Sequence, residues 1–87
     1  MNMKEIIAEL EYARDHYQYG FVEVTIPGQT DTEMIINRSA SLDNKIAYYK
    51  KAYGEDGVHC MNDQIKIIRA GSVEGLTVKH KASVQMD

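Results

Sequence analysis

The chain has 87 residues, of which 44% are apolar and 26% charged, and its formal net charge is −3. This composition excludes a disordered chain, and the length suits one small domain over residues 1–87. No stretch reaches the roughly 20 apolar residues that cross a bilayer, and the single cysteine, Cys60, has no intramolecular disulfide partner. We therefore expect a cytoplasmic protein that does not enter a membrane.

The charge is unevenly distributed along the chain. Residues 1–43 contain three basic and eight acidic residues, whereas residues 44–87 contain seven basic and five acidic ones. An acidic surface repels nucleic acid and attracts basic protein surfaces. A solvated helix face that binds nothing is the simpler interpretation of the same pattern.

An amphipathic helix is predicted over residues 3–17. Asn2 can cap its first turn, and Glu5, three residues later, can reach back to the backbone N–H of the cap. Apolar residues recur at helical spacing and should form a buried stripe. The stripe consists of Met3, Ile6, Ile7, Leu10, Ala13 and Tyr17.

Two strands are predicted next. Over residues 21–26, Val22 and Val24 point to one face, and the strand should end at Pro27 and Gly28. A second alternating segment follows over residues 33–37. The short polar link between the two strands favours an antiparallel hairpin.

A second helix is predicted to begin near Ser41, which is its expected cap. Its inward stripe consists of Leu42, Ile46, Tyr49 and Tyr53. We expect Gly54 to end the helix in the left-handed conformation.

The remaining segment is predicted to be mostly β. Residues 58–61 favour a short strand, residues 64–70 indicate a second strand more clearly, and residues 71–75 favour a turn. Residues 76–84 could return as a last strand, and the polar end at 80–87 could instead be disordered. The expected fold is α+β: an antiparallel sheet of three to five strands with two helices packed on one face, in the order α-β-β-α-β-β, with room for a further strand.

No residues assemble a catalytic or metal site. His59 and Cys60 are adjacent, so on a strand they would point to opposite faces and could not share an ion. Cys60 is expected to be a small buried thiol. No glycine-rich phosphate loop occurs. We therefore predict that the protein is not an enzyme and uses no cofactor and no metal.

Tyrosine is unusually frequent, with six tyrosines beside one phenylalanine and no tryptophan. A tyrosine ring suits helix–sheet packing and protein interfaces alike. Three tyrosines lie on the predicted stripes and are expected in the core. The interface candidates are the other three, together with acidic residues of the first helix: Tyr12, Tyr19, Tyr48, Glu5, Glu9 and Asp15.

Basic residues of the second half carry an alternative hypothesis, because basic grooves with interleaved rings hold single-stranded nucleic acids. The candidates are Lys45, Lys50, Lys51, Lys66 and Arg69. Neighbouring acidic residues dilute this patch, and the overall charge opposes nucleic-acid binding.

Three segments carry a resemblance: Glu-Met-Ile-Ile-Asn at 33–37, the helix at 42–53 with Tyr-Tyr-Lys at 48–50, and Gln-Ile-Lys-Ile-Ile at 64–68. Together they resemble small uncharacterised proteins encoded by phages and prophages of low-GC Gram-positive bacteria. Arg38 stands where that pattern has a proline, and the chain after Ala70 has no counterpart in it. The resemblance implies a mobile-element origin and assigns no functional residue.

Three functional hypotheses follow. The first is a stoichiometric binder of a host or phage protein, such as an anti-CRISPR inhibitor of a bacterial nuclease. The second is a nucleic-acid-binding accessory protein in phage replication. The third is a homo-oligomeric structural protein whose tyrosines form the contacts between its own subunits. The sequence does not predict the oligomeric state.

Overall fold

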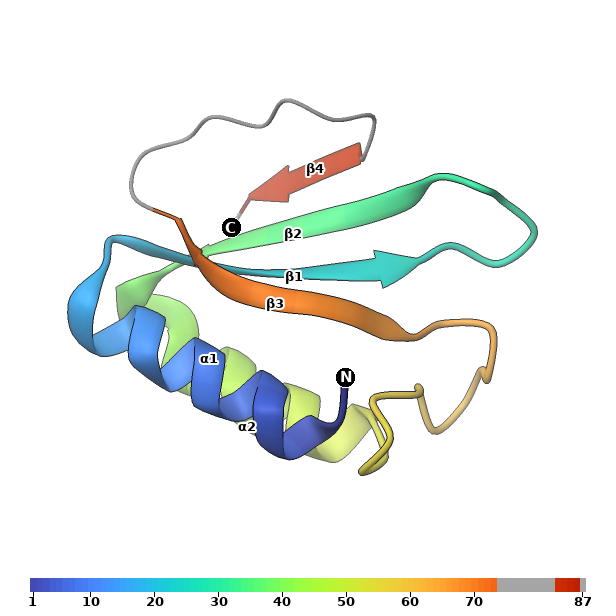
Figure 1. Cartoon of the computed structure of the whole chain (residues 1–87), viewed down its shortest axis with the longest axis horizontal. Coiled ribbons are helices and arrows are strands. Elements are labelled where there is room, and N and C mark those ends of the chain that lie inside the picture. The colour runs from blue at the N-terminus through green and yellow to red at the C-terminus, as the bar shows by residue number, and fades with distance from the viewer. Residues whose placement is uncertain (74–82, 87) are drawn as a thin grey trace.

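The computed structural model describes residues 1–73 and 83–86. Within this part of the chain, two α-helices lie on one side of a four-stranded sheet (Figure 1). The elements are α1 (Met3–His16), β1 (Tyr19–Thr25), β2 (Thr32–Arg38), the 3-10 turn η1 (Ser39–Ser41), α2 (Leu42–Ala52), β3 (Ile67–Val73) and β4 (Ser83–Met86). The predicted α+β class is confirmed, with two helices and an antiparallel sheet of three strands.

The strands are arranged in the order β3-β1-β2-β4. β1 pairs antiparallel with β2, placing Val22 opposite Ile35, and antiparallel with β3, placing Val22 opposite Ala70. The predicted hairpin is therefore confirmed. β4 runs parallel to β2, so only three of the four strands form the expected antiparallel sheet.

The main hydrophobic core lies between the helices and the sheet. The predicted stripe of α1 is buried from Met3 to Ala13, and Leu42, Ile46 and Tyr49 are buried on α2. Val22 and Val24 contribute from β1, as their alternation predicts. The predicted capping box of α1 is also present, since Glu5 N–H donates to Asn2 Oδ1 and Asn2 N–H donates to Glu5 Oε1.

The opposite face of the sheet holds a second set of contacts. Glu23, only 13% exposed, accepts a hydrogen bond from Thr32 on β2 and pairs with Arg69 on β3 at 3.0 Å. The Arg69 guanidinium also lies 5.2 Å from the centroid of the Phe21 ring. Met34 is buried on β2 although it is not part of the main core cluster. Side chains therefore pack on both faces of the β1–β2 hairpin.

The end of α2 differs from the prediction. Tyr53 caps the helix in an extended conformation, and the left-handed glycine of this loop is Gly57, with φ 80°, rather than Gly54. Ser41 occupies the expected cap position but makes no side-chain capping hydrogen bond. Ser41 is itself in the helical region because it belongs to η1, and its hydroxyl therefore does not take up the extended capping geometry.

The segment after α2 also differs. Residues 58–61 form no strand; they contribute only two isolated bridges, from Tyr53 to His59 and from Val58 to Lys66. The strand predicted at 64–70 is β3, which starts later and continues through Gly71 to Val73, where a turn was expected. Pairing of Tyr19 with Val73 extends β3, and this pairing is a tertiary contact that local sequence does not encode.

Only part of the last predicted strand lies within the residues that the structure describes. Residues 76–82 lie outside the described residues, as do 74, 75 and 87. Ser83–Met86 form β4, within the segment 80–87 that was also open to disorder. No helix within the described residues is long and apolar enough to cross a bilayer.

Candidate functional site

The two helices lie side by side and run antiparallel, as Figure 1 shows. An ion pair joins the end of α1 to the start of α2, with Arg14 Nη1 2.7 Å from Asp43 Oδ1. Arg14 Nε also lies 2.9 Å from Asp15 Oδ1. These hydrogen bonds raise the pKa of Arg14 and lower the pKa of Asp15. At this end of the seam, an ion pair therefore bridges the two helices.

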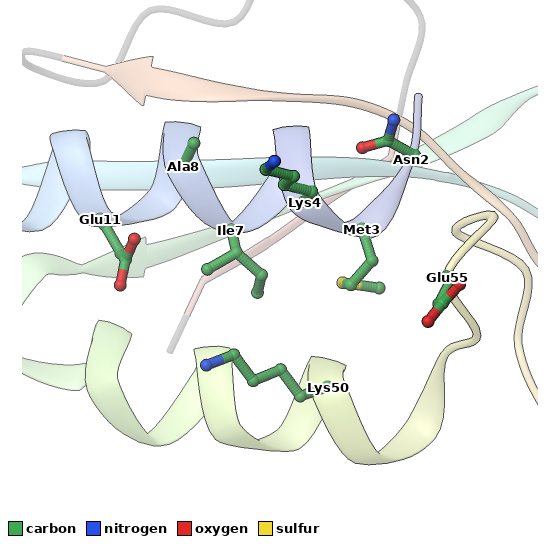
Figure 2. A pocket seen from close by; sticks show the side chains of 8 residues that line it. All are labelled: Asn2, Met3, Lys4, Ile7, Ala8, Glu11, Lys50 and Glu55. Carbon is green, nitrogen blue, oxygen red and sulfur yellow. The ribbon is translucent and has the colours of Figure 1, made fainter.

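The other half of the seam is an open groove of about 720 Å³. Figure 2 shows Met3, Ile7 and Glu11 projecting from α1 towards α2, with Lys50 along α2 and Glu55 at one end. The lining residues are Asn2, Met3, Lys4, Ile7, Ala8, Glu11, Lys50 and Glu55. The groove thus has an apolar floor and a charged rim.

Within the described residues, the rim charges have no ion-pair partner. Lys4, Glu11, Lys50 and Glu55 are exposed, and none of them forms an ion pair with another described residue. The backbone at one end is fixed, because Met3 N–H donates to the Glu55 carbonyl oxygen at 2.8 Å. A groove with both signs of charge around apolar side chains can recognise a complementary protein surface.

Tyr12 lies on the exposed face of α1 and does not line the groove. Its side chain is 53% exposed, and its ring centroid lies 4.4 Å from that of His16 and 6.0 Å from that of Tyr17. Helical spacing places Glu9 and His16 on the same exposed face as Tyr12. The two neighbouring rings restrict the Tyr12 side chain, so little conformational freedom remains to be lost when a partner binds.

The three acidic interface candidates differ in their surroundings. Glu5 is engaged in the capping box and Asp15 in the ion pair with Arg14. Glu9 is exposed and forms no ion pair with the described residues. Only Glu9 therefore presents its full charge to a partner.

The other two interface tyrosines lie on different surfaces. Tyr48 is 51% exposed on α2, with its ring 5.5 Å from Tyr49. It lies about 160° around the helix axis from Lys50, at 100° per residue, on the flank remote from α1. Tyr19 is half-buried and alternates with the core-facing Gly20 and Val22, so it lies on the far face of the sheet. The structure does not gather Tyr12, Tyr19 and Tyr48 into one patch.

Cys60 is exposed, which contradicts the expectation of a buried thiol. The reason is that residues 58–61 do not enter the sheet. The neighbouring His59 accepts a hydrogen bond at Nδ1 from Met61 N–H at 3.0 Å, and its ring lies 5.0 Å from that of Tyr53. Burial raises the pKa of Tyr53, and the nearby Tyr48 and Glu33 add to the effect. His59 thus has a packing role beside Tyr53.

The five basic candidates are scattered. Lys50 lines the groove, and Lys45 is half-buried on the other flank of α2. Arg69 pairs with Glu23 on the far face of the sheet, and Lys66 is exposed just before β3. Lys51 is exposed near the end of α2. This arrangement makes no continuous basic groove of the kind that tracks a nucleic-acid backbone. Among the described residues, no group of three or more histidine, cysteine or carboxylate side chains could hold a metal ion.

The groove is the feature that sequence reasoning missed. Met3 and Ile7 were predicted as part of a buried stripe, and they are largely buried. Their position at the edge of that stripe, next to Lys4 and Glu11, is the one local signal of a boundary between core and solvent. The second wall comes from Lys50, more than 40 residues later in the chain, and local periodicity does not reveal it.

Comparison of the chain with protein-family models, with curated proteins and with solved structures finds no significant match. The functional argument therefore depends on the surface chemistry described above.

Proposed function

We propose that this protein acts by stoichiometric binding to another protein, through the exposed face of α1. The observation that carries the proposal is Tyr12, a half-exposed ring held in place by the rings of His16 and Tyr17. Exposed, preorganised tyrosines are frequent binding hot spots because they bury a large area at a small entropic cost.

The charge of this face defines the kind of partner. Glu9 and Glu11 lie near Tyr12 on α1 without ion-pair partners among the described residues. The first 43 residues carry eight acidic against three basic residues. Such a surface accelerates association with a basic protein surface.

The biological setting of the proposal is a phage-infected bacterial cell. Its support is the resemblance of segments 33–37, 42–53 and 64–68 to small phage and prophage proteins. CRISPR nucleases carry strongly basic channels for nucleic acid, so an acidic binder can occupy such a surface in place of DNA or RNA. We therefore propose inhibition of a bacterial antiviral protein, such as a CRISPR nuclease, in the cytoplasm.

A DNA-cleavage assay tests this proposal. Increasing amounts of the protein are added to a purified CRISPR nuclease from a Gram-positive bacterium, and cleavage of a labelled target is measured. We expect inhibition that saturates near one inhibitor per nuclease, with direct binding measured by calorimetry. Inhibition only at large excess, or heat changes without a defined stoichiometry, would contradict a stoichiometric inhibitor.

Variants of Tyr12 localise the surface. We expect Tyr12→Ala to weaken binding by about 30-fold or more, because a hot-spot tyrosine contributes about 2 kcal/mol. Tyr12→Phe should retain most of the affinity, since the ring supplies the contact. Tyr48→Ala is the matched control, because Tyr48 is equally exposed but lies on the far flank of α2. Equal losses for Tyr12→Ala and Tyr48→Ala would rule out the α1 face as the binding surface.

A further inference from the structure

We infer that the groove between α1 and α2 receives an amphipathic α-helix of the partner, carrying basic side chains at both ends of its apolar stripe. This inference rests on the proposed function and specifies which element of the partner is bound.

The dimensions of the groove match a helix of about two turns. The groove follows α1 from Met3 to Glu11, and the eight steps between these residues rise about 12 Å at 1.5 Å per residue. Its floor residues, Met3 and Ile7, are one helical turn apart and project towards α2 (Figure 2). A third helix packs well along the seam of two antiparallel helices because its side-chain ridges enter the groove between them.

The backbone chemistry of the walls favours a helix over an extended segment. The walls are α-helices, and their interior N–H and C=O groups are already paired within each helix. A strand laid in this groove would find no row of backbone partners and would leave its own polar groups unsatisfied. A helix satisfies its backbone internally and needs only apolar side chains to meet the floor.

Three of the four rim charges specify the sequence pattern of that helix, because the fourth, Lys4, points away from α2 in Figure 2. Glu55 and Glu11 lie at opposite ends of the groove, and Lys50 lies between them on the α2 wall (Figure 2). None of these three residues pairs with another described residue. Basic side chains at the two ends of the bound helix and one acidic side chain near its middle would complement them.

A synthetic peptide serves as the probe. It is a fluorescein-labelled, amidated helix of 14 residues with leucines spaced i, i+4 and i+7, lysines at both ends, and one glutamate near its middle beside the leucine stripe. The control peptide has the same composition in an order that breaks the apolar stripe. Binding is measured by fluorescence anisotropy, and amide chemical shifts of the isotope-labelled protein locate the site. We expect the patterned peptide to bind at least tenfold more tightly and to shift the amides of Met3, Ile7 and Ala8.

Matched variants of the protein test the location. Ala8→Arg places a long side chain on the exposed rim of the groove, and we expect it to weaken peptide binding at least tenfold. Asn44→Arg adds a positive charge at an exposed position of α2 that does not line the groove and lies 120° around the helix axis from Lys50, and it should change affinity less than twofold. Glu11→Gln combined with Glu55→Gln should weaken binding most at low salt, where charge attraction is least screened.

The result that would overturn the inference is equal binding of the two peptides, or chemical shifts confined to β3 or to the far face of the sheet. Equal effects of Ala8→Arg and Asn44→Arg would also overturn it. The proposed function is judged separately, because the nuclease assay and Tyr12→Ala report on protein binding whatever element of the partner is bound. If the protein inhibits the nuclease but does not prefer the patterned peptide, the proposed function is retained. The inference that the partner binds through a helix is then rejected.

Discussion

At the scale of single residues, Gly57 is the position where the backbone most clearly requires glycine. It has φ 80°, and a Cβ built there would lie 2.8 Å from the Met1 carbonyl oxygen. Its own carbonyl accepts a hydrogen bond from Ile67 N–H at 2.9 Å. The loop after α2, the N-terminus and the start of β3 therefore meet at this residue.

We expect Gly57→Ala to lower the free energy of unfolding by about 2 kcal/mol or more, because left-handed strain adds to a backbone clash. Gly54→Ala is the control: Gly54 does not have a positive φ, and its added Cβ would meet the end of the Asp56 side chain at 3.1 Å. That change should cost less than about 1 kcal/mol, within the range of substitutions that create neither strain nor a buried clash. Urea unfolding measures the stability of both variants. Equal losses of stability would contradict the assignment of Gly57 as the glycine that this loop requires.

Sequence could not decide between these two glycines. Both lie in the run Gly-Glu-Asp-Gly that follows α2, and each suits a left-handed turn. The choice follows from the hydrogen bonds that the loop makes, in which Gly54 N–H donates to Val58 O and Gly57 N–H donates to Gly54 O. Those bonds depend on where β3 pairs, and β3 is aligned by β1.

At the scale of elements, α1 combines a stabilising role and a binding role on the same helix. Glu5 closes the capping box, whereas Glu9, one turn later, makes no ion pair with the described residues. The sequence predicted the capping role of Glu5 but did not distinguish Glu9 from Asp15 as surface charges. The structure distinguishes them by their hydrogen bonds.

We expect Glu5→Lys to lower the free energy of unfolding by about 1 kcal/mol, since it removes a capping contact and places a positive charge at the positive end of the helix dipole. For a domain of this size the melting temperature should fall by about 4–8 °C. Glu9→Lys should leave the melting temperature nearly unchanged and slow association with a basic partner. Thermal unfolding and stopped-flow binding measure the two effects, and a shared effect on stability would argue against the separation of roles.

At the scale of the whole molecule, Gly20 lies where β1, α1 and α2 come together. A Cβ at this position would lie 3.0 Å from Leu42 Cδ1 and 3.1 Å from Ala13 Cβ. The glycine is needed here for space rather than for backbone conformation, because its φ is not positive. Both helices approach the sheet closely at this point.

We expect Gly20→Ala to destabilise the protein by about 1–3 kcal/mol through overpacking. Leu42→Val shortens the nearest side chain, so it should cost less in the Gly20→Ala background than in the wild type. A coupling of about 0.5 kcal/mol or more in a double-mutant cycle, measured by urea unfolding, would show the contact. Strict additivity of the two changes would contradict it.

Local sequence patterns were sufficient to predict the two helices, the β1–β2 hairpin and the faces that these elements bury. The stripes of α1 and α2, the alternation of Val22 and Val24, and the capping box are all local patterns, and local spacing fixes which side of an element is apolar. Tertiary structure alone decided the parallel pairing of β4 with β2, the exposure of Cys60 and the groove between the helices. Each of these features depends on residues that are distant in the chain and become neighbours only when the elements pack. The periodicity within one element carries no information about such distant neighbours.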